Sequence, residues 1–119
     1  MTRRGLTAGA DNSAMDRQQQ IDRFLASAHR VAIARLRADP TAIERVRAQL
    51  ARWRSMAGPT RSDAYWDEWS SLLDAGVEAL ERAVCADSDH AQVLRSVSPI
   101  SVLLTQRERT ELLNEARAS

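Results

Sequence analysis

The stretch SDAYWDEWSSLLDAGVEALERAVCA, residues 62–86, decides the fold. Its large apolar side chains recur at helical spacing and form one broad face, and carboxylates form a narrow stripe roughly opposite. The apolar face contains Trp66, Trp69, Leu72, Leu73, Gly76, Val77, Leu80 and Val84, and the stripe contains Asp67, Asp74, Glu78 and Glu81. Ser62 and Asp63 are typical N-cap residues. The pattern predicts one amphipathic helix that ends at about Ala86.

Two helices with arginine-bearing faces are predicted before this stretch. Residues 16–38 place Ile21, Leu25, Ala28 and Ala32 on one face, and residues 41–56 place Ile43, Val46, Leu50 and Trp53 on another. Between them, either Asp39 caps a helix that starts with Pro40, or Thr41 and Glu44 form a capping box. Because this turn is short, we expect the two helices to pack antiparallel. Residues 16–57 are then a basic helical hairpin.

The remainder of the chain is also predicted to be helical. Gly58-Pro59 ends the second helix, and Asp87-Ser88 caps a short helix that Ser98-Pro99 breaks. Thr105 and Glu108 have the spacing of a capping box that opens a final helix. No stretch alternates with period two, so no sheet is expected. We predict an all-α bundle of four to five helices in a single domain, with residues 60–117 as its acidic, aromatic region and residues 1–15 as a disordered tail; Met15 is a candidate start.

The charge is divided along the chain. All seventeen basic residues are arginine, and the net charge is +1. Residues 16–54 hold nine arginines against four acids, which gives +5, and residues 55–92 hold two arginines against eight acids, which gives −6. Such asymmetry indicates charged partners or internal charge pairing. A single cysteine excludes an internal disulfide, and no stretch approaches the roughly 20 apolar residues of a membrane span, so a cytoplasmic protein is expected.

The residues that carry chemistry are few. No nucleophile elbow, glycine-rich phosphate loop or paired-cysteine motif is found, so we predict neither an enzyme nor a cofactor or metal site. The Asp87-Ser88-Asp89-His90 stretch is interpreted as a helix cap with favourable dipole charges. His29 is interpreted as a partly buried packing residue and Cys85 as a small hydrophobic one.

Two clusters allow a functional and a structural interpretation. Trp53, Tyr65, Trp66 and Trp69 could form the core or anchor an interface. The arginine faces could follow a phosphate backbone, or they could be solvated or pair with the acidic stripe, within one chain or in a dimer. The arginines concerned are Arg23, Arg30, Arg37, Arg45 and Arg52. We favour the structural interpretation, in which the arginines are solvated or paired, because no side chains nearby are arranged to read base edges.

Several segments resemble a known family when they are taken in order. They are RW (52–53), YWDEWSSLL (65–73), LRSVSPI (94–100) and VLLTQRER (102–109). This order is similar to that of small helical antitoxins encoded beside nucleotidyltransferase-type toxins in mycobacteria and related bacteria. The match covers roughly residues 52–113. An aromatic residue follows the Ser-Pro pair in the family pattern, whereas Ile100 stands there in this chain.

The resemblance implies that the chain binds and neutralises a toxin that modifies RNA, by masking its active site or RNA groove. A toxin with a basic groove would fit an acidic stripe beside exposed tryptophans. The expected contact residues are Trp66, Trp69, Asp67, Asp74, Glu78 and Arg95, with Trp53 in the core. The alternatives are a small DNA-binding regulator that uses the arginine-rich hairpin, with weak or autoregulatory binding, and a structural protein that forms homo-oligomers.

Overall fold

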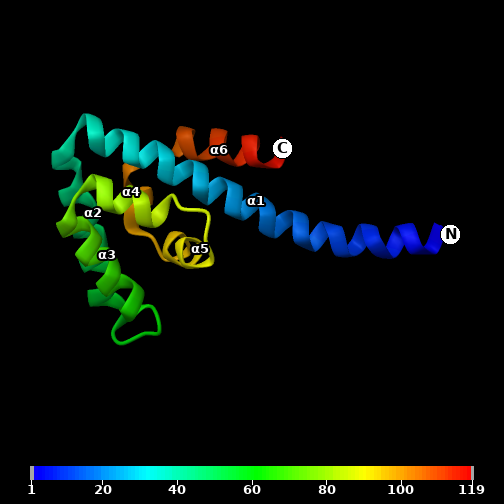
Figure 1. Ribbon diagram of the computed structural model, residues 1–119, viewed down its shortest axis with the longest axis horizontal. Helices are drawn as coiled ribbons and strands as arrows, with labels where there is room; N and C mark the ends of the chain where they lie inside the picture. The colour runs from blue at the N-terminus through cyan, green and yellow to red at the C-terminus, as the bar shows by residue number, and fades with distance from the viewer. Residues whose placement is uncertain (1, 119) are drawn as a thin grey trace.

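The computed structural model is built from helices (Figure 1). The structure describes residues 17–118, and the tail predicted for residues 1–15 lies outside them. The elements in chain order are α1 (Thr2–Ala38, described from Arg17 onward), η1 (Pro40–Ala42), α2 (Ile43–Ala57), α3 (Asp63–Ala75), α4 (Val77–Val84), α5 (Asp89–Ser96), η2 (Pro99–Leu103) and α6 (Gln106–Ala118), where η marks a 3₁₀ helix. No strand occurs in the described range. The predicted all-α class is therefore confirmed, with six α-helices in place of the four to five expected.

Gly76 is the reason for the higher count. The predicted helix over residues 62–86 is divided into α3 and α4 at this residue, whose φ is +109° and whose ψ is 173°. A residue with a side chain rarely adopts this backbone conformation. The amide of Gly76 still donates to the carbonyl of Leu72, and the amide of Leu80 donates to the carbonyl of Gly76. The helical hydrogen bonds therefore continue up to the break and resume after it, while the chain changes direction.

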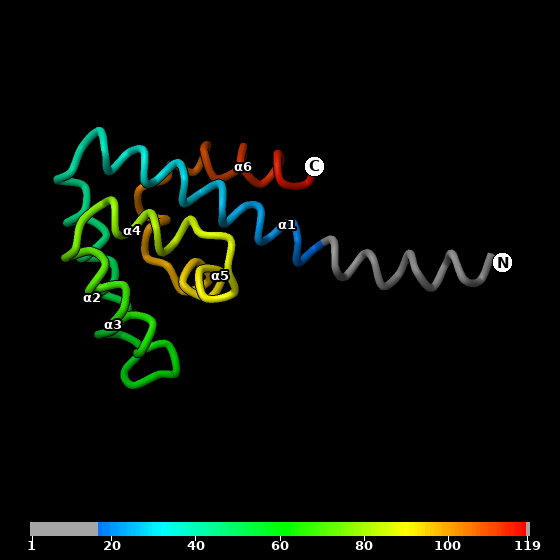
Figure 2. Tube along the Cα trace, viewed as in Figure 1, coloured from blue at the N-terminus to red at the C-terminus, as the bar shows by residue number. Residues whose placement is uncertain are grey.

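The arrangement of α1 and α2 differs from the predicted antiparallel hairpin. Helix α2 turns away from the C-terminal end of α1 and packs chiefly against η2 and α3, while α6 is the helix that lies along α1 (Figures 1 and 2). The predicted packing of α1 against α2 is wrong because the apolar face of α2, with Val46 and Leu50, is covered by other segments. The turn itself was predicted correctly in one of its two forms, since Asp39 caps η1 by accepting from the amide of Thr41 at 3.2 Å.

A single hydrophobic core joins these elements. Its largest fully buried members come from α1, α3, α4, α5 and η2: they include Ile33, Leu36, Trp69, Leu73, Leu80, Leu94 and Ile100. The residues predicted as helix faces supply most of this core. The N-caps at Ser88 and at the Thr105–Glu108 box form as predicted, with the amide of Glu108 donating to the Thr105 hydroxyl at 3.0 Å. Ser62 makes no such bond, and Asp63 instead accepts from the amide of Thr60 at 3.2 Å.

Candidate protein-binding groove

The two tryptophans that were predicted to face a partner lie in the core. Trp69 is fully buried and Trp66 is 8% exposed. Their indole N–H groups donate to the carbonyls of Leu94 at 2.9 Å and Val97 at 3.0 Å, at the C-terminal end of α5. The last carbonyls of a helix lack partners within that helix, so these bonds satisfy groups that would otherwise be unpaired. In this conformation Trp69 offers no surface to a partner, and we assign both rings to the core.

Arg95 is likewise a structural residue. It is 6% exposed, and its guanidinium donates to the carbonyl of Val84 at 2.6 Å and to that of Ala86 at 3.0 Å. These carbonyls lie at and just beyond the C-terminal end of α4. Helix α5 therefore caps α4 through Arg95 in the same way that α3 caps α5 through its tryptophans. The burial of Arg95 corrects its assignment as a contact residue.

Trp53 shows the opposite departure from expectation. It was assigned to the core, but it is the most exposed of the three tryptophans, half-buried against the side of the core. Its ring lies 6.4 Å from that of Trp66. Near it, at the C-terminal end of α2, Met56 is 79% exposed. The helical pattern placed all three tryptophans on apolar faces, and only the packing of α5 against α3 decided which of them would be covered.

The predicted carboxylates remain on the surface. Asp67 on α3 accepts from the Arg54 guanidinium at 2.7 Å, and Asp74 accepts from that of Arg47. The side chains of these aspartates are still 70% and 69% exposed. Glu78 is exposed on α4. The neighbouring Glu81 pairs with Arg37 of α1 through two bonds, at 3.0 and 2.5 Å, which lowers the pKa of Glu81.

A groove runs between α2 and α3, and the two aspartate–arginine pairs stand at its edges. It encloses about 240 Å³ and is lined by Arg47, Leu50, Ala51, Arg54, Ser70 and Leu73. Arg47 and Arg54 are two turns apart on α2, as are Asp74 and Asp67 on α3, so the antiparallel helices bring each arginine to its own aspartate. The result is an apolar floor between two ion pairs, with exposed carboxylates along the α3 edge. We name this feature the α2–α3 groove.

Sequence reasoning found the acidic edge of this groove but not its arginine edge or its floor. The signal for the basic edge was present, because Arg47 and Arg54 repeat the seven-residue spacing of Asp67 and Asp74. The floor could not be found in the same way, since Leu50 and Leu73 are typical core residues and are 3% and 2% exposed.

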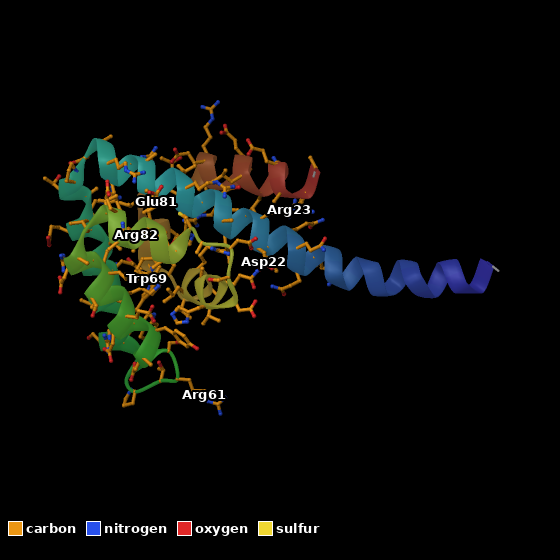
Figure 3. The ribbon with its side chains drawn as sticks, viewed as in Figure 1. Asp22, Arg23, Arg61, Trp69, Glu81 and Arg82 are labelled. Carbon is orange, nitrogen blue, oxygen red and sulfur yellow. The ribbon has the colours of Figure 1, made fainter. Side chains whose placement is uncertain are left out.

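The five arginines considered for nucleic-acid binding do not form one continuous stripe. Arg37 pairs with Glu81, Arg45 donates to the carbonyl of Val102 at 2.9 Å, and Arg30 donates to the Ser27 hydroxyl at 3.3 Å. Arg23 and Arg30 line one hollow beside α6, whereas Arg52 is exposed on α2. Figure 3 shows Arg23 on the side of α1 that faces α6. Because α2 turns away from α1, Arg45 and Arg52 do not continue the row of arginines along α1.

His29 and Cys85 have the environments expected of structural residues. His29 is 1% exposed, with Nδ1 2.7 Å from the carbonyl of Leu25 and Nε2 2.7 Å from the Ser98 hydroxyl. Burial lowers the pKa of His29 to about 4. Burial and the nearby Glu81 raise the pKa of the Cys85 thiol, which disfavours the reactive thiolate.

The Asp87–His90 region forms no metal cluster. His90 instead contacts the Glu68 carboxylate at 2.8 Å. Over the described part of the chain, no group of three His, Cys, Asp or Glu side chains could hold a metal ion. Among the same residues, no helix has the length and apolar character needed to cross a membrane.

The chain has no match among protein-family models, curated proteins or solved structures.

Proposed function

We propose that this chain is an antitoxin that binds a nucleotidyltransferase-like toxin and masks its active site or RNA groove, and that the α2–α3 groove is the contact surface. The observation that carries the proposal is the position of Asp67 and Asp74, two largely exposed carboxylates that are fixed beside an apolar floor. A protein that handles RNA presents basic side chains where the RNA lies. Such side chains can bind the open carboxylate oxygens while an apolar side chain of the toxin enters the groove.

The two aspartate–arginine pairs affect how strongly this surface can bind a basic partner. Arg54 and Arg47 neutralise part of the charge of Asp67 and Asp74, so the attraction for a basic partner is weaker than that of a bare acidic stripe. The same pairs hold the carboxylates in place, so that less side-chain entropy is lost on binding. Since Trp66 and Trp69 are buried, the apolar anchor belongs to the toxin and not to this chain.

The family resemblance supports the same proposal from the sequence. Two of its segments, residues 65–73 and 94–100, contain the partners of the tryptophan hydrogen bonds, Trp66 with Val97 and Trp69 with Leu94. Its last segment contains the Thr105–Glu108 capping box. The shared residues are therefore of the kind that maintains a common packing arrangement, and an antitoxin of that family would need the same core.

The proposal predicts a nucleotidyltransferase-like reading frame beside the gene of this chain, and the absence of such a frame would contradict it. Co-expression of the chain with that enzyme is the direct test. We expect the wild-type chain to bind that enzyme and to restore growth of cells that express it. The double variant D67R/D74R should weaken binding by about tenfold or more, because it replaces two exposed carboxylates with positive charges that repel the basic groove of the toxin. The variant A51F should also weaken it, because it fills the groove without changing the charge.

A matched control distinguishes the groove from net charge. The variant D22R/E111R makes the same change in net charge on α1 and α6, and it should bind like the wild type. Circular dichroism of every variant must remain helical. Failure of the wild-type chain to bind or neutralise the nucleotidyltransferase would overturn the proposed function, whereas full activity of folded D67R/D74R and A51F would overturn only the assigned groove.

A further inference from the structure

A second groove lies at the other end of the molecule, between α1 and α6. It encloses about 230 Å³ and is lined by Arg17, Gln20, Ile21, Phe24, Leu113, Ala116 and Arg117. Figures 1 and 2 show α6 running beside α1 in the opposite direction, far from the α2–α3 hairpin. The floor is apolar: Ile21 is 51% exposed, and Phe24 and Leu113 are half-buried. Ile21 and Met56 are the most exposed large apolar residues of the described chain.

The size of the groove favours a side chain over a small molecule. Its volume is below the roughly 300–1,000 Å³ that is typical of small-molecule sites. An open channel between two antiparallel helices is instead the kind of surface on which a third helix packs, with its apolar side chains between the two.

The charged residues that line this groove are of one sign. Arg17 and Arg117 are exposed at its rim, and no aspartate or glutamate lines it. Over residues 17–118, neither arginine forms an ion pair, whereas Arg35, Arg37, Arg47 and Arg54 are each paired with a carboxylate. Figure 3 shows Asp22, an acidic residue of α1, on the side that faces α5 and not α6. The rim therefore holds two exposed arginines that form no ion pair within the described residues.

We infer that the α1–α6 groove binds an acidic amphipathic helix of a partner protein. The apolar side chains of that helix would pack against Ile21, Phe24 and Leu113, and its carboxylates would pair with Arg17 and Arg117. Charge complementarity decides the occupant. A second copy that used the same surface would bring the arginines of one chain near those of the other. A nucleic-acid backbone would satisfy the arginines but leave the apolar floor uncovered. This inference does not rest on the proposed antitoxin function.

A designed helix serves as the probe, because the natural partner is unidentified. The probe is a fluorescent, end-capped peptide of about 20 residues, long enough to be helical in water, with leucines on one face and glutamates on both sides of them. Anisotropy titrations with the full chain should give saturable binding. The double variant R17E/R117E should weaken binding by about tenfold or more, and I21S should weaken it because it removes apolar floor.

Reversing the charges on both the peptide and the protein tests whether the ion pairs form at this groove. A second peptide, with lysines in place of the glutamates, should bind R17E/R117E better than it binds the wild type. The control R52E/R61E makes the same change in net charge on α2 and on the loop before α3, where Figure 3 shows Arg61 far from α6. It should leave binding of the first peptide unchanged. The inference is overturned if the wild type shows no saturable binding up to about 1 mM peptide, if R52E/R61E weakens binding as much as R17E/R117E does, or if duplex DNA binds this face and the peptide does not.

Discussion

The indole N–H of Trp69 donates to the carbonyl of Leu94 at 2.9 Å, within the core and without access to water. This bond joins the middle of α3 to the end of α5, two segments that are separated by α4 along the chain. A buried carbonyl that loses a donor is not compensated by water. Trp69 is therefore a cap for another helix as well as an apolar residue.

We expect W69F to destabilise the protein by roughly 2–4 kcal/mol, because it removes the donor and leaves a cavity. The variant W66F removes the equivalent donor to Val97 at a ring that is 8% exposed, so its cost should be smaller. Urea denaturation followed by far-ultraviolet circular dichroism measures both. Equal midpoints for W69F and the wild type would show that the hydrogen bond and the indole contribute nothing to stability.

Arg95 gives a second prediction about helix ends. Replacing it with methionine preserves the length and the apolar stem but leaves the carbonyls of Val84 and Ala86 without the guanidinium. The expected loss is on the order of 2 kcal/mol, because buried acceptors lose a charged donor. The exposed Arg82 on α4 is the matched control, and R82M should change the free energy of unfolding by less than about 0.5 kcal/mol. A similar effect of both substitutions would argue against the cap.

These caps explain which parts of the structure could be predicted. The helices at α2, α5 and α6, and the turn at Asp39-Pro40, follow from apolar periodicity and capping residues that act over a few positions. The burial of Trp66 and Trp69 depends on α5, which lies about 25 residues further along the chain, so a helical pattern alone could not separate core from interface. The acidic edge of the α2–α3 groove could be predicted because charged residues are visible in the sequence. Its apolar floor could not, because the sequence does not show which segment packs against an apolar face.

The break at Gly76 was the error with the clearest local cause. A Cβ at this position would meet no atom within 4 Å, so the cost of G76A comes from the backbone conformation alone. We expect a loss of roughly 1–3 kcal/mol, because alanine disfavours a φ of +109°. A matched substitution, A75G, places a new glycine on the helical side of the break, and its cost should be close to 1 kcal/mol or below. If G76A is as stable as the wild type, α3 and α4 can join into the single helix that the sequence pattern predicted.

The burial of His29 leads us to expect that the free energy of unfolding decreases in mild acid. The Nδ1–H donates to the carbonyl of Leu25, so the neutral ring accepts from the Ser98 hydroxyl at Nε2. Burial is the main cause that lowers its pKa, from 6.5 to about 4; the bond to Leu25 opposes this, and Arg95 adds to it. Between these two values the unfolded chain binds the proton and the folded chain does not. The contribution of His29 is therefore complete above pH 6.5 and is lost as the pH falls toward 4, by roughly 3 kcal/mol in total.

Glu108 should also make the protein less stable as the pH falls, but at lower pH than His29. Its two bonds to Arg35, at 2.9 and 2.7 Å, and the amide of Thr105 lower its pKa from 4.5 to about 2, so its contribution is present above pH 4.5 and is lost toward pH 2. Urea denaturation across these ranges separates the two groups. The variant H29Q should lose most of the pH dependence that the wild type shows between 6.5 and 4.5, and E108Q should keep it. A wild-type stability that stays constant from pH 6.5 to 4 would show that His29 is protonated in the folded protein as readily as in the unfolded chain.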